Sequence, residues 1–117
     1  MTDDQFYEVW NRACAGGAGA SALEGDVALQ KMLLGHGYIM NGGLQHFGDL
    51  SAQEQDEAIG GFRFFSFHEI ADLLMRVPGM SAADLDDPQN AYIEFDSAML
   101  DNVRSHIEAN PHQFSSV

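Results

Sequence analysis

Apolar residues recur at intervals of three and four residues along most of this sequence, and this period constrains the fold more than any other feature. The clearest example begins at Ser66 and Glu69, which have the spacing of a helix-capping box. The apolar face that follows consists of Phe67, Ile70, Ala71 and Leu74. No internal repeat or low-complexity segment interrupts such patterns. We therefore expect an all-α fold, a single compact multi-helix domain over residues 1–117 with about five to seven helices.

Two further capping boxes predict helix starts. Thr2 with Gln5 precedes a helix expected over residues 3–14. Ser51 with Glu54 precedes another helix, whose apolar face consists of Ala58, Phe62 and Phe65. The aromatic run over residues 62–67 could also form a strand, because it follows two glycines. The helical period that continues beyond it favours two helices that meet near residue 66.

Three more helices complete the prediction. A helix over residues 21–40 has a broad apolar face that includes Leu23, Val27, Leu34 and Met40. A short helix follows at residues 44–47. The last helix is expected over residues 91–109, ends at Asn110-Pro111, and buries Leu100, Val103 and Ile107. The aspartate-rich run before it, residues 81–90, contains a proline and is expected to be irregular or a single turn.

The triplet Asn41-Gly42-Gly43 separates two of these helices. Asparagine and glycine tolerate positive φ, so the triplet predicts a left-handed turn at the end of the longer helix. We therefore assign Asn41, Gly42 and Gly43 a structural role.

Charge is the most unusual bulk property of the chain. Eighteen Asp and Glu against five Lys and Arg give a formal net charge of −13 and an isoelectric point near 4.3. Such a chain repels nucleic acid and anionic membranes and attracts basic protein surfaces. The basic residues are too few and too scattered to neutralise a useful number of phosphates, so we expect no direct nucleic-acid binding. The acidic start, the single cysteine and the lack of a long apolar run predict a cytoplasmic protein without a membrane segment.

Candidate catalytic groups are sparse. In His68-Glu69-Ile70-Ala71-Asp72, an aspartate stands where a zinc-protease helix has its second histidine. A third ligand would have to come from His36, His46, His106 or His112. The structural interpretation, that Glu69 caps a helix whose polar side carries His68 and Asp72, is favoured. Cys14 lies at the end of a predicted helix, where the dipole disfavours a thiolate. We therefore expect no enzyme activity, no catalytic residue, no metal and no cofactor.

The acids themselves are the strongest candidates for a binding surface. Pairs such as Asp4 with Glu8 lie three or four positions apart and repel each other by a few tenths of a kcal/mol on a helix. Rows of carboxylates at such spacings resemble, in order of magnitude, the phosphate charges along a nucleic-acid backbone. Acids in or beside loops are least constrained by neighbouring cations. The predicted partner-binding residues are therefore Asp49, Glu54, Asp56, Glu57, Asp84, Asp86 and Asp87.

The stretch Tyr38-Ile39-Met40-Asn41-Gly42-Gly43-Leu44-Gln45-His46-Phe47 resembles a motif of the Asn-Gly-Gly-Phe-x-Gln-Phe type. This motif is typical of a family of small acidic bacterial proteins, a domain of unknown function whose best-known member is described as a double-stranded-DNA mimic. The resemblance covers about residues 24–114. Two looser patterns extend it, Glu57-Ala58-Ile59 through Phe62 and Phe65, and Asn110-Pro111-His112-Gln113-Phe114. The sequence departs from the family at Leu44, where phenylalanine is usual, and at His46-Phe47, where an aromatic pair is expected.

The resemblance implies an α-helical fold, no catalysis, and acid presented to a DNA-binding regulator, and it allows a homodimer. Together with the charge, it leads to the hypothesis of a DNA mimic that occupies a basic protein surface. Two alternatives stay open. One is an immunity-type or other acidic protein-binding module, and the other is a metal-dependent hydrolase that uses His68, Glu69 and Asp72.

Overall fold

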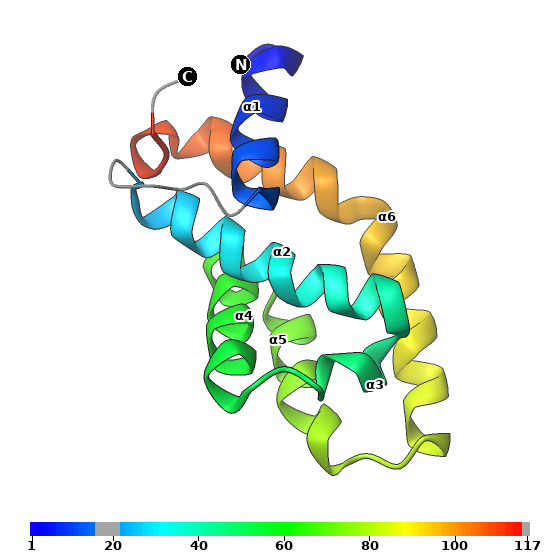
Figure 1. Cartoon of the computed structure of the whole chain (residues 1–117). Coiled ribbons are helices and arrows are strands. Elements are labelled where there is room, and N and C mark those ends of the chain that lie inside the picture. Colours follow the sequence, from blue (N-terminus) through cyan, green and yellow to red (C-terminus); the bar gives the residue numbers. More distant parts are fainter. Residues whose placement is uncertain (16–21, 116–117) are drawn as a thin grey trace.

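The computed structural model describes residues 1–15 and 22–115, and this part of the chain is all-α, without a strand (Figure 1). The number of helices agrees with the prediction. In chain order the elements are α1 (Asp3–Cys14), α2 (Glu24–Gly42), α3 (Leu44–Phe47), α4 (Ala52–Phe64), α5 (His68–Arg76), the 3₁₀ turns η1 (Val77–Gly79) and η2 (Ala83–Leu85), α6 (Asp86–Ala109) and the 3₁₀ turn η3 (Pro111–Gln113).

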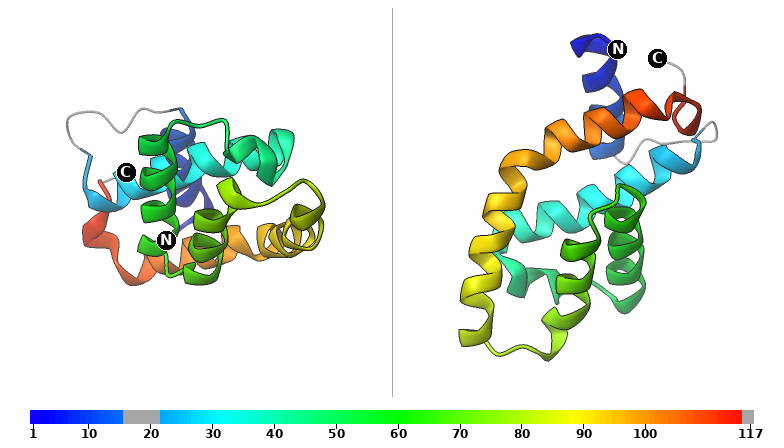
Figure 2. Two further views of the ribbon diagram at one scale, coloured as in Figure 1. Left: turned by 90° about the horizontal axis from the view of Figure 1, so that it is seen from below. Right: turned by 180° about the vertical axis from the view of Figure 1, so that it is seen from behind.

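The two longest helices organise the others. Figures 1 and 2 show that α2 and the C-terminal half of α6 run side by side. Helix α1 lies on one side of this pair, while α3, α4 and α5 lie on the other. One continuous buried cluster joins all six α-helices, and its largest fully buried side chains include Tyr92, Phe6, Phe47 and Phe62. Within the described residues, no helix is both long and apolar enough to cross a membrane.

Helix α2 packs through its small residues rather than through the predicted apolar face. A Cβ atom added at Gly35 would lie 2.8 Å from the Cβ of Ala58 on α4, and one at Gly61 of α4 would lie 2.6 Å from the backbone oxygen of Ala28. Helices α2 and α4 can approach each other this closely only on the faces that carry Gly35 and Gly61. The predicted face is therefore wrong: Leu23, Val27, Leu34 and Met40 are exposed, and the buried apolar side chains of α2 are Leu29, Met32, Leu33 and Ile39. The predicted start at residue 21 lies outside the described residues.

The capping boxes at Thr2 and Ser51 are present as predicted, whereas the one at Ser66 is wrong. Ser66 adopts φ +66° and ends α4, because its N–H bonds to the carbonyl of Arg63 while the N–H of Phe67 bonds to that of Phe62. This pair of hydrogen bonds is the Schellman motif that closes helix C-termini. Helix α5 begins only at His68. The two-helix interpretation is thus confirmed, and the aromatic strand is not formed.

Helix α6 begins at Asp86, five residues before the predicted start at residue 91. Pro88 occupies its third position, where an N–H has no intrahelical acceptor, so the proline does not interrupt the helix. Asp86 and Asp87 lie in the first turn, where the helix dipole favours negative charge. The expectation of an irregular segment therefore holds only for the residues before Asp86, and the predicted stop at Asn110 is confirmed.

The turn between α2 and α3 depends on two glycines for different reasons. Gly43 has φ +79° and ψ 178°, a conformation that is essentially restricted to glycine. Gly42 is the last residue of α2, and a Cβ atom there would lie 2.6 Å from the ring of His46. Asn41 is also helical, so only one residue of the predicted turn has positive φ. The first N–H of α3, at Leu44, donates to Oε1 of Gln89 on α6 at 2.7 Å.

Asp26 joins three separate parts of the chain. It is 3% exposed, and its carboxylate accepts hydrogen bonds from the guanidinium of Arg12 on α1 at 2.8 Å and from the N–H of Ser115 near the C-terminus at 2.8 Å. The N–H of Leu23 donates to it at 3.1 Å. Burial by itself raises the pKa of the Asp26 carboxyl, but these donors more than offset burial and hold the pKa below its ordinary value.

We predict that Gly43→Val lowers the free energy of unfolding by about 2 kcal/mol or more, because valine cannot adopt this φ without strain. Urea denaturation measures the change. Gly37→Ala is the matched control, since it lies in α2 and nothing occupies the space within 4 Å of its added Cβ. This control should raise stability by about 0.5–1 kcal/mol. Equal effects of the two substitutions would contradict the assigned turn.

We predict that Asp26→Asn lowers the free energy of unfolding at neutral pH by about 3 kcal/mol, because it breaks a buried ion pair. A lowered pKa in the folded state stabilises the protein above the ordinary carboxyl pKa of about 4, and this stability is lost as pH falls through the folded-state pKa. The difference between wild type and Asp26→Asn in urea denaturation should therefore shrink as pH is lowered from 7 to 3. A difference that does not depend on pH would show that the carboxylate charge is not responsible. Asp101→Asn, at an exposed position, is the control and should change stability by less than about 0.5 kcal/mol.

Candidate acidic interaction surface

Most of the few basic side chains form ion pairs within the molecule. Four of the five form ion pairs with carboxylates, at 2.8 Å for Arg12–Asp26, 2.9 Å for Lys31–Glu57, 2.8 Å for Arg63–Asp72 and 2.6 Å for Arg104–Asp3. Within the described residues, Arg76 is exposed and has no such partner. Glu108 also lies 3.8 Å from Arg104 and 3.8 Å from the N-terminal ammonium group. The other carboxylates in the described part of the chain have no Lys or Arg partner.

The seven predicted binding acids divide into two kinds. Four have local partners: the Glu54 carboxylate accepts hydrogen bonds from Ser51, Glu57 pairs with Lys31, Asp84 exchanges hydrogen bonds with Ser81, and Asp49 lies 3.8 Å from His46. The other three are exposed and make no side-chain hydrogen bond or ion pair in the part of the chain described here. These are Asp56, Asp86 and Asp87.

The structure brings the predicted acids to one end of the molecule but not into one patch. The N-terminal ends of α4 and α6 lie at the same end, the lower one in Figure 1 and in the right view of Figure 2. They are on opposite sides of that end, with α5 and η1 between them. Residues 49–57 and residues 84–87 are thus two separate acidic regions.

Helix α6 carries a longer series of acids that the sequence analysis missed. Asp87, Glu94, Asp101 and Glu108 recur at every seventh residue and are all exposed, and we call them the α6 acidic row. Seven residues advance a helix by about 10 Å and return to nearly the same face. The row therefore extends about 30 Å along the side of α6 opposite to the buried Tyr92, Met99 and Val103. Three of its members, Glu94, Asp101 and Glu108, lie within the predicted helix, and the earlier start of α6 adds Asp87.

A partly buried polar chain connects α2 with α6. Nδ1 of His36 lies 2.7 Å from the hydroxyl of Tyr92, and Nε2 lies 3.1 Å from Oδ1 of Asp96. Burial lowers the pKa of His36, against the opposing effect of Asp96. The neutral ring therefore accepts from Tyr92 and donates to Asp96. Because Tyr92 is 0% exposed and burial raises its pKa further, the chain of groups holds two helices together rather than facing a substrate.

The residues of the hydrolase alternative do not converge. His68 and Glu69 both line a groove between α5 and α6, whereas Asp72 is not part of that lining and pairs with Arg63 on α4. Glu69 also does not cap α5, because that helix begins at His68. Among the described residues, no group of three or more His, Cys, Asp or Glu side chains is arranged to hold a metal ion. His36, His46 and His106 each make a hydrogen bond of their own.

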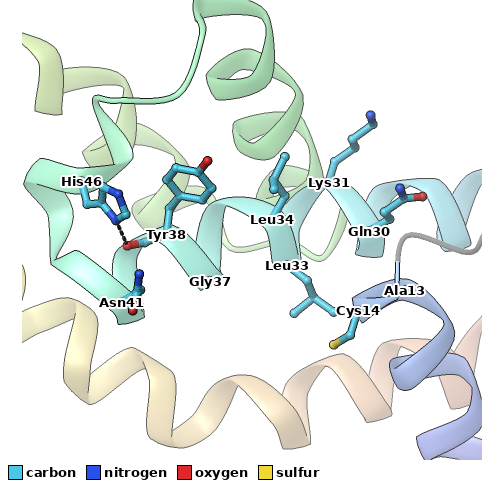
Figure 3. Close-up of a pocket in the computed structure, with 10 residues that line it drawn as sticks. All are labelled: Ala13, Cys14, Gln30, Lys31, Leu33, Leu34, Gly37, Tyr38, Asn41 and His46. Atoms are coloured by element: carbon cyan, nitrogen blue, oxygen red, sulfur yellow. Dashed lines mark hydrogen bonds between the residues drawn. The ribbon is translucent and has the colours of Figure 1, made fainter.

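A hollow of about 610 Å³ lies beside α2 (Figure 3). At one end, Nδ1 of His46 donates to the carbonyl of Tyr38 at 3.0 Å, and the two rings are tilted by 30° with centroids 4.8 Å apart. Cys14 of α1 lies at the other end. Burial raises the pKa of the Cys14 thiol, so the thiolate is disfavoured, and no base in the described part of the chain is hydrogen-bonded to it. The hollow therefore lacks an activated nucleophile.

No family model matches the sequence, and comparisons with curated proteins and with solved structures give no significant match. The resemblance to the DNA-mimic family therefore remains a prediction.

Proposed function

We propose that this chain is a non-enzymatic acidic binding protein that occupies the basic surface of a DNA-binding protein, in the manner of a double-stranded-DNA mimic. The α6 acidic row is the observation that carries the proposal. Three of its four members, Asp87, Glu94 and Asp101, have no ion-pair partner within the described residues, so the row presents exposed charge at regular intervals over about 20 Å of one helix.

The spacing of the row supports this interpretation. Steps of about 10 Å correspond to about three base pairs along one strand of duplex DNA. The carboxylates of the row are more widely spaced than the phosphates of DNA. Each carboxylate can nevertheless pair with a Lys or Arg of the partner that would otherwise contact the DNA backbone. Such phosphate contacts position a protein on DNA without reading its sequence, so a mimic needs only the charge pattern.

The internal pairing of the basic side chains also supports the proposed function. Because four of the five basic side chains are held by internal partners, few cations remain to repel a basic partner. A net charge of −13 also accelerates association with a basic protein through long-range attraction. The cytoplasmic location expected from the sequence forms part of the proposal, since DNA-binding regulators work there.

An immunity-type module that neutralises one basic partner, such as a nuclease, is the second candidate. It is favoured by the concentration of Asp84, Asp86 and Asp87 within four residues at the start of α6, which forms a local rather than an extended acidic patch. The two candidates differ in how far along α6 the partner makes contact.

We predict that the protein, immobilised at low salt, captures basic DNA-binding proteins from a bacterial lysate and that duplex DNA displaces them. Neutralising or reversing the row with Asp87→Asn, Glu94→Lys and Asp101→Lys should abolish most of this capture and leave the melting temperature nearly unchanged, because all three side chains are exposed. Mass spectrometry of the eluates identifies and quantifies the captured proteins.

The matched control variant is Asp4→Asn with Glu8→Lys and Glu24→Lys, which changes the net charge by the same amount on α1 and α2. Equal losses of capture in the two variants would show that net charge alone matters and would contradict a defined acidic row. Loss only when Asp84, Asp86 and Asp87 are replaced, with one captured protein, would favour the immunity-type module.

A further inference from the structure

Helix α5 and the N-terminal part of α6 line an open groove of about 1020 Å³. Its floor is apolar and aromatic: Phe67 and Phe95 meet edge to face, with ring centroids 4.8 Å apart, and Ile70 lies beside them in the groove lining. All three side chains are only partly buried. The core therefore leaves an apolar strip uncovered between two helices.

The groove has the dimensions of a short helix. On α6 its lining recurs at residues 87, 88, 91, 94 and 95, which is one continuous helical face. Eight residue steps along that face measure about 12 Å, or somewhat more than two helical turns. A helix laid in the groove could place apolar side chains at positions i, i+3 or i+4, and i+7 on the floor.

Acidic side chains border this floor on both helices. Glu69 lies on α5, and Asp87 and Glu94, two members of the α6 acidic row, lie on α6. All three are exposed, and none makes a hydrogen bond or ion pair within the described residues. One cation, Arg76, also lines the groove, so the acids outnumber it three to one.

We infer that this groove binds a basic amphipathic helix of a partner protein, about two to three turns long, with its apolar face on Phe67, Ile70 and Phe95 and its Lys or Arg side chains against Glu69, Asp87 and Glu94. The inference rests on the proposed function and adds the mode of binding: the partner contributes an apolar anchor in addition to positive charge. The negative charge at the border of the groove determines which kind of partner can bind there. A second copy of this acidic chain would bring like charges together at the border, and nucleic acid would be repelled there.

The acidic border and the apolar floor of the groove contribute differently to the free energy of binding. Exposed ion pairs contribute about 1 kcal/mol or less each and depend on salt, so the border acids select basic partners and accelerate encounter. Burial of the apolar floor depends little on salt and contributes in proportion to the area covered. Binding should therefore persist at physiological ionic strength only for a helix with an ordered apolar face.

The probe for the test is a fluorescein-labelled basic helical peptide with leucines at i, i+3 and i+7 and lysines or arginines on both sides of them. A scrambled peptide of the same composition is the charge control. Fluorescence anisotropy with the full chain should show at least about tenfold tighter binding of the amphipathic peptide at physiological salt. Both peptides should bind at low salt if acidic attraction operates as in the proposed function.

Two tryptophan substitutions locate the site. Ala91→Trp fills the groove from an exposed position on α6 and should weaken the amphipathic peptide about tenfold or more. Ala98→Trp lies one heptad further along α6, is exposed, and is outside the groove, so it should leave binding unchanged. The melting temperatures of both variants should match wild type.

Three outcomes would overturn the inference. Equal binding of the two peptides, unaffected by Ala91→Trp, would overturn the groove while leaving acidic attraction intact. Failure of both peptides to bind even at low salt would overturn the groove and also contradict the proposed function. Self-association of the wild-type chain in analytical ultracentrifugation, abolished by Ala91→Trp but not by Ala98→Trp, would assign the groove to a second copy instead.

Discussion

The close approach of α2 and α4 is the contact on which the rest of the structure depends. It exists because Gly35 and Gly61 lack a Cβ at the two points where the helices meet, and because Ala58 is small enough to lie opposite Gly35. This contact selects which face of α2 is buried, so it also determines that Leu23, Val27, Leu34 and Met40 face outward. With α4 fixed against α2, the Schellman turn at Ser66 leads directly into α5, and α5 becomes one wall of the groove that α6 completes.

The electrostatics follow from the same packing. Arg12 and Arg104 join α1 to α2 and α6, and Lys31 and Arg63 join α4 to its neighbours, so the scarce cations stabilise contacts between helices. Each of these pairs removes a positive charge from the surface that a partner meets. The acids of the α6 acidic row lie on the exposed side of α6 because the opposite side of that helix is buried. Internal pairing of the cations and exposure of the acids are therefore two consequences of one arrangement.

Local patterns predicted most of the fold. The capping boxes at Thr2 and Ser51 and the glycine at residue 43 were interpreted correctly, because each depends on residues within one or two turns. The failures at Ser66 and at the start of α6 arose where one local pattern has two meanings: a serine can cap a helix or end one, and a proline can break a helix or lie in its first turn. The candidate site was predicted only in part. Asp86 and Asp87 are exposed as expected, whereas the α6 acidic row was missed although three of its four members lie within the predicted helix. The groove depends on how α5 and α6 face each other, which no local pattern specifies.

The central claim is that the exposed side of α6 is the surface that meets a basic partner. The most direct measurement is nuclear magnetic resonance of the ¹⁵N-labelled protein, with backbone amide shifts followed as the main DNA-displaceable protein from the lysate capture is added. The account predicts that the perturbed amides follow α6 from Asp87 through Glu94 to Asp101, together with α5 at the groove, and that the perturbations weaken with added salt. Perturbations confined to the apolar outer face of α2, around Val27 and Leu34, and insensitive to salt would contradict it.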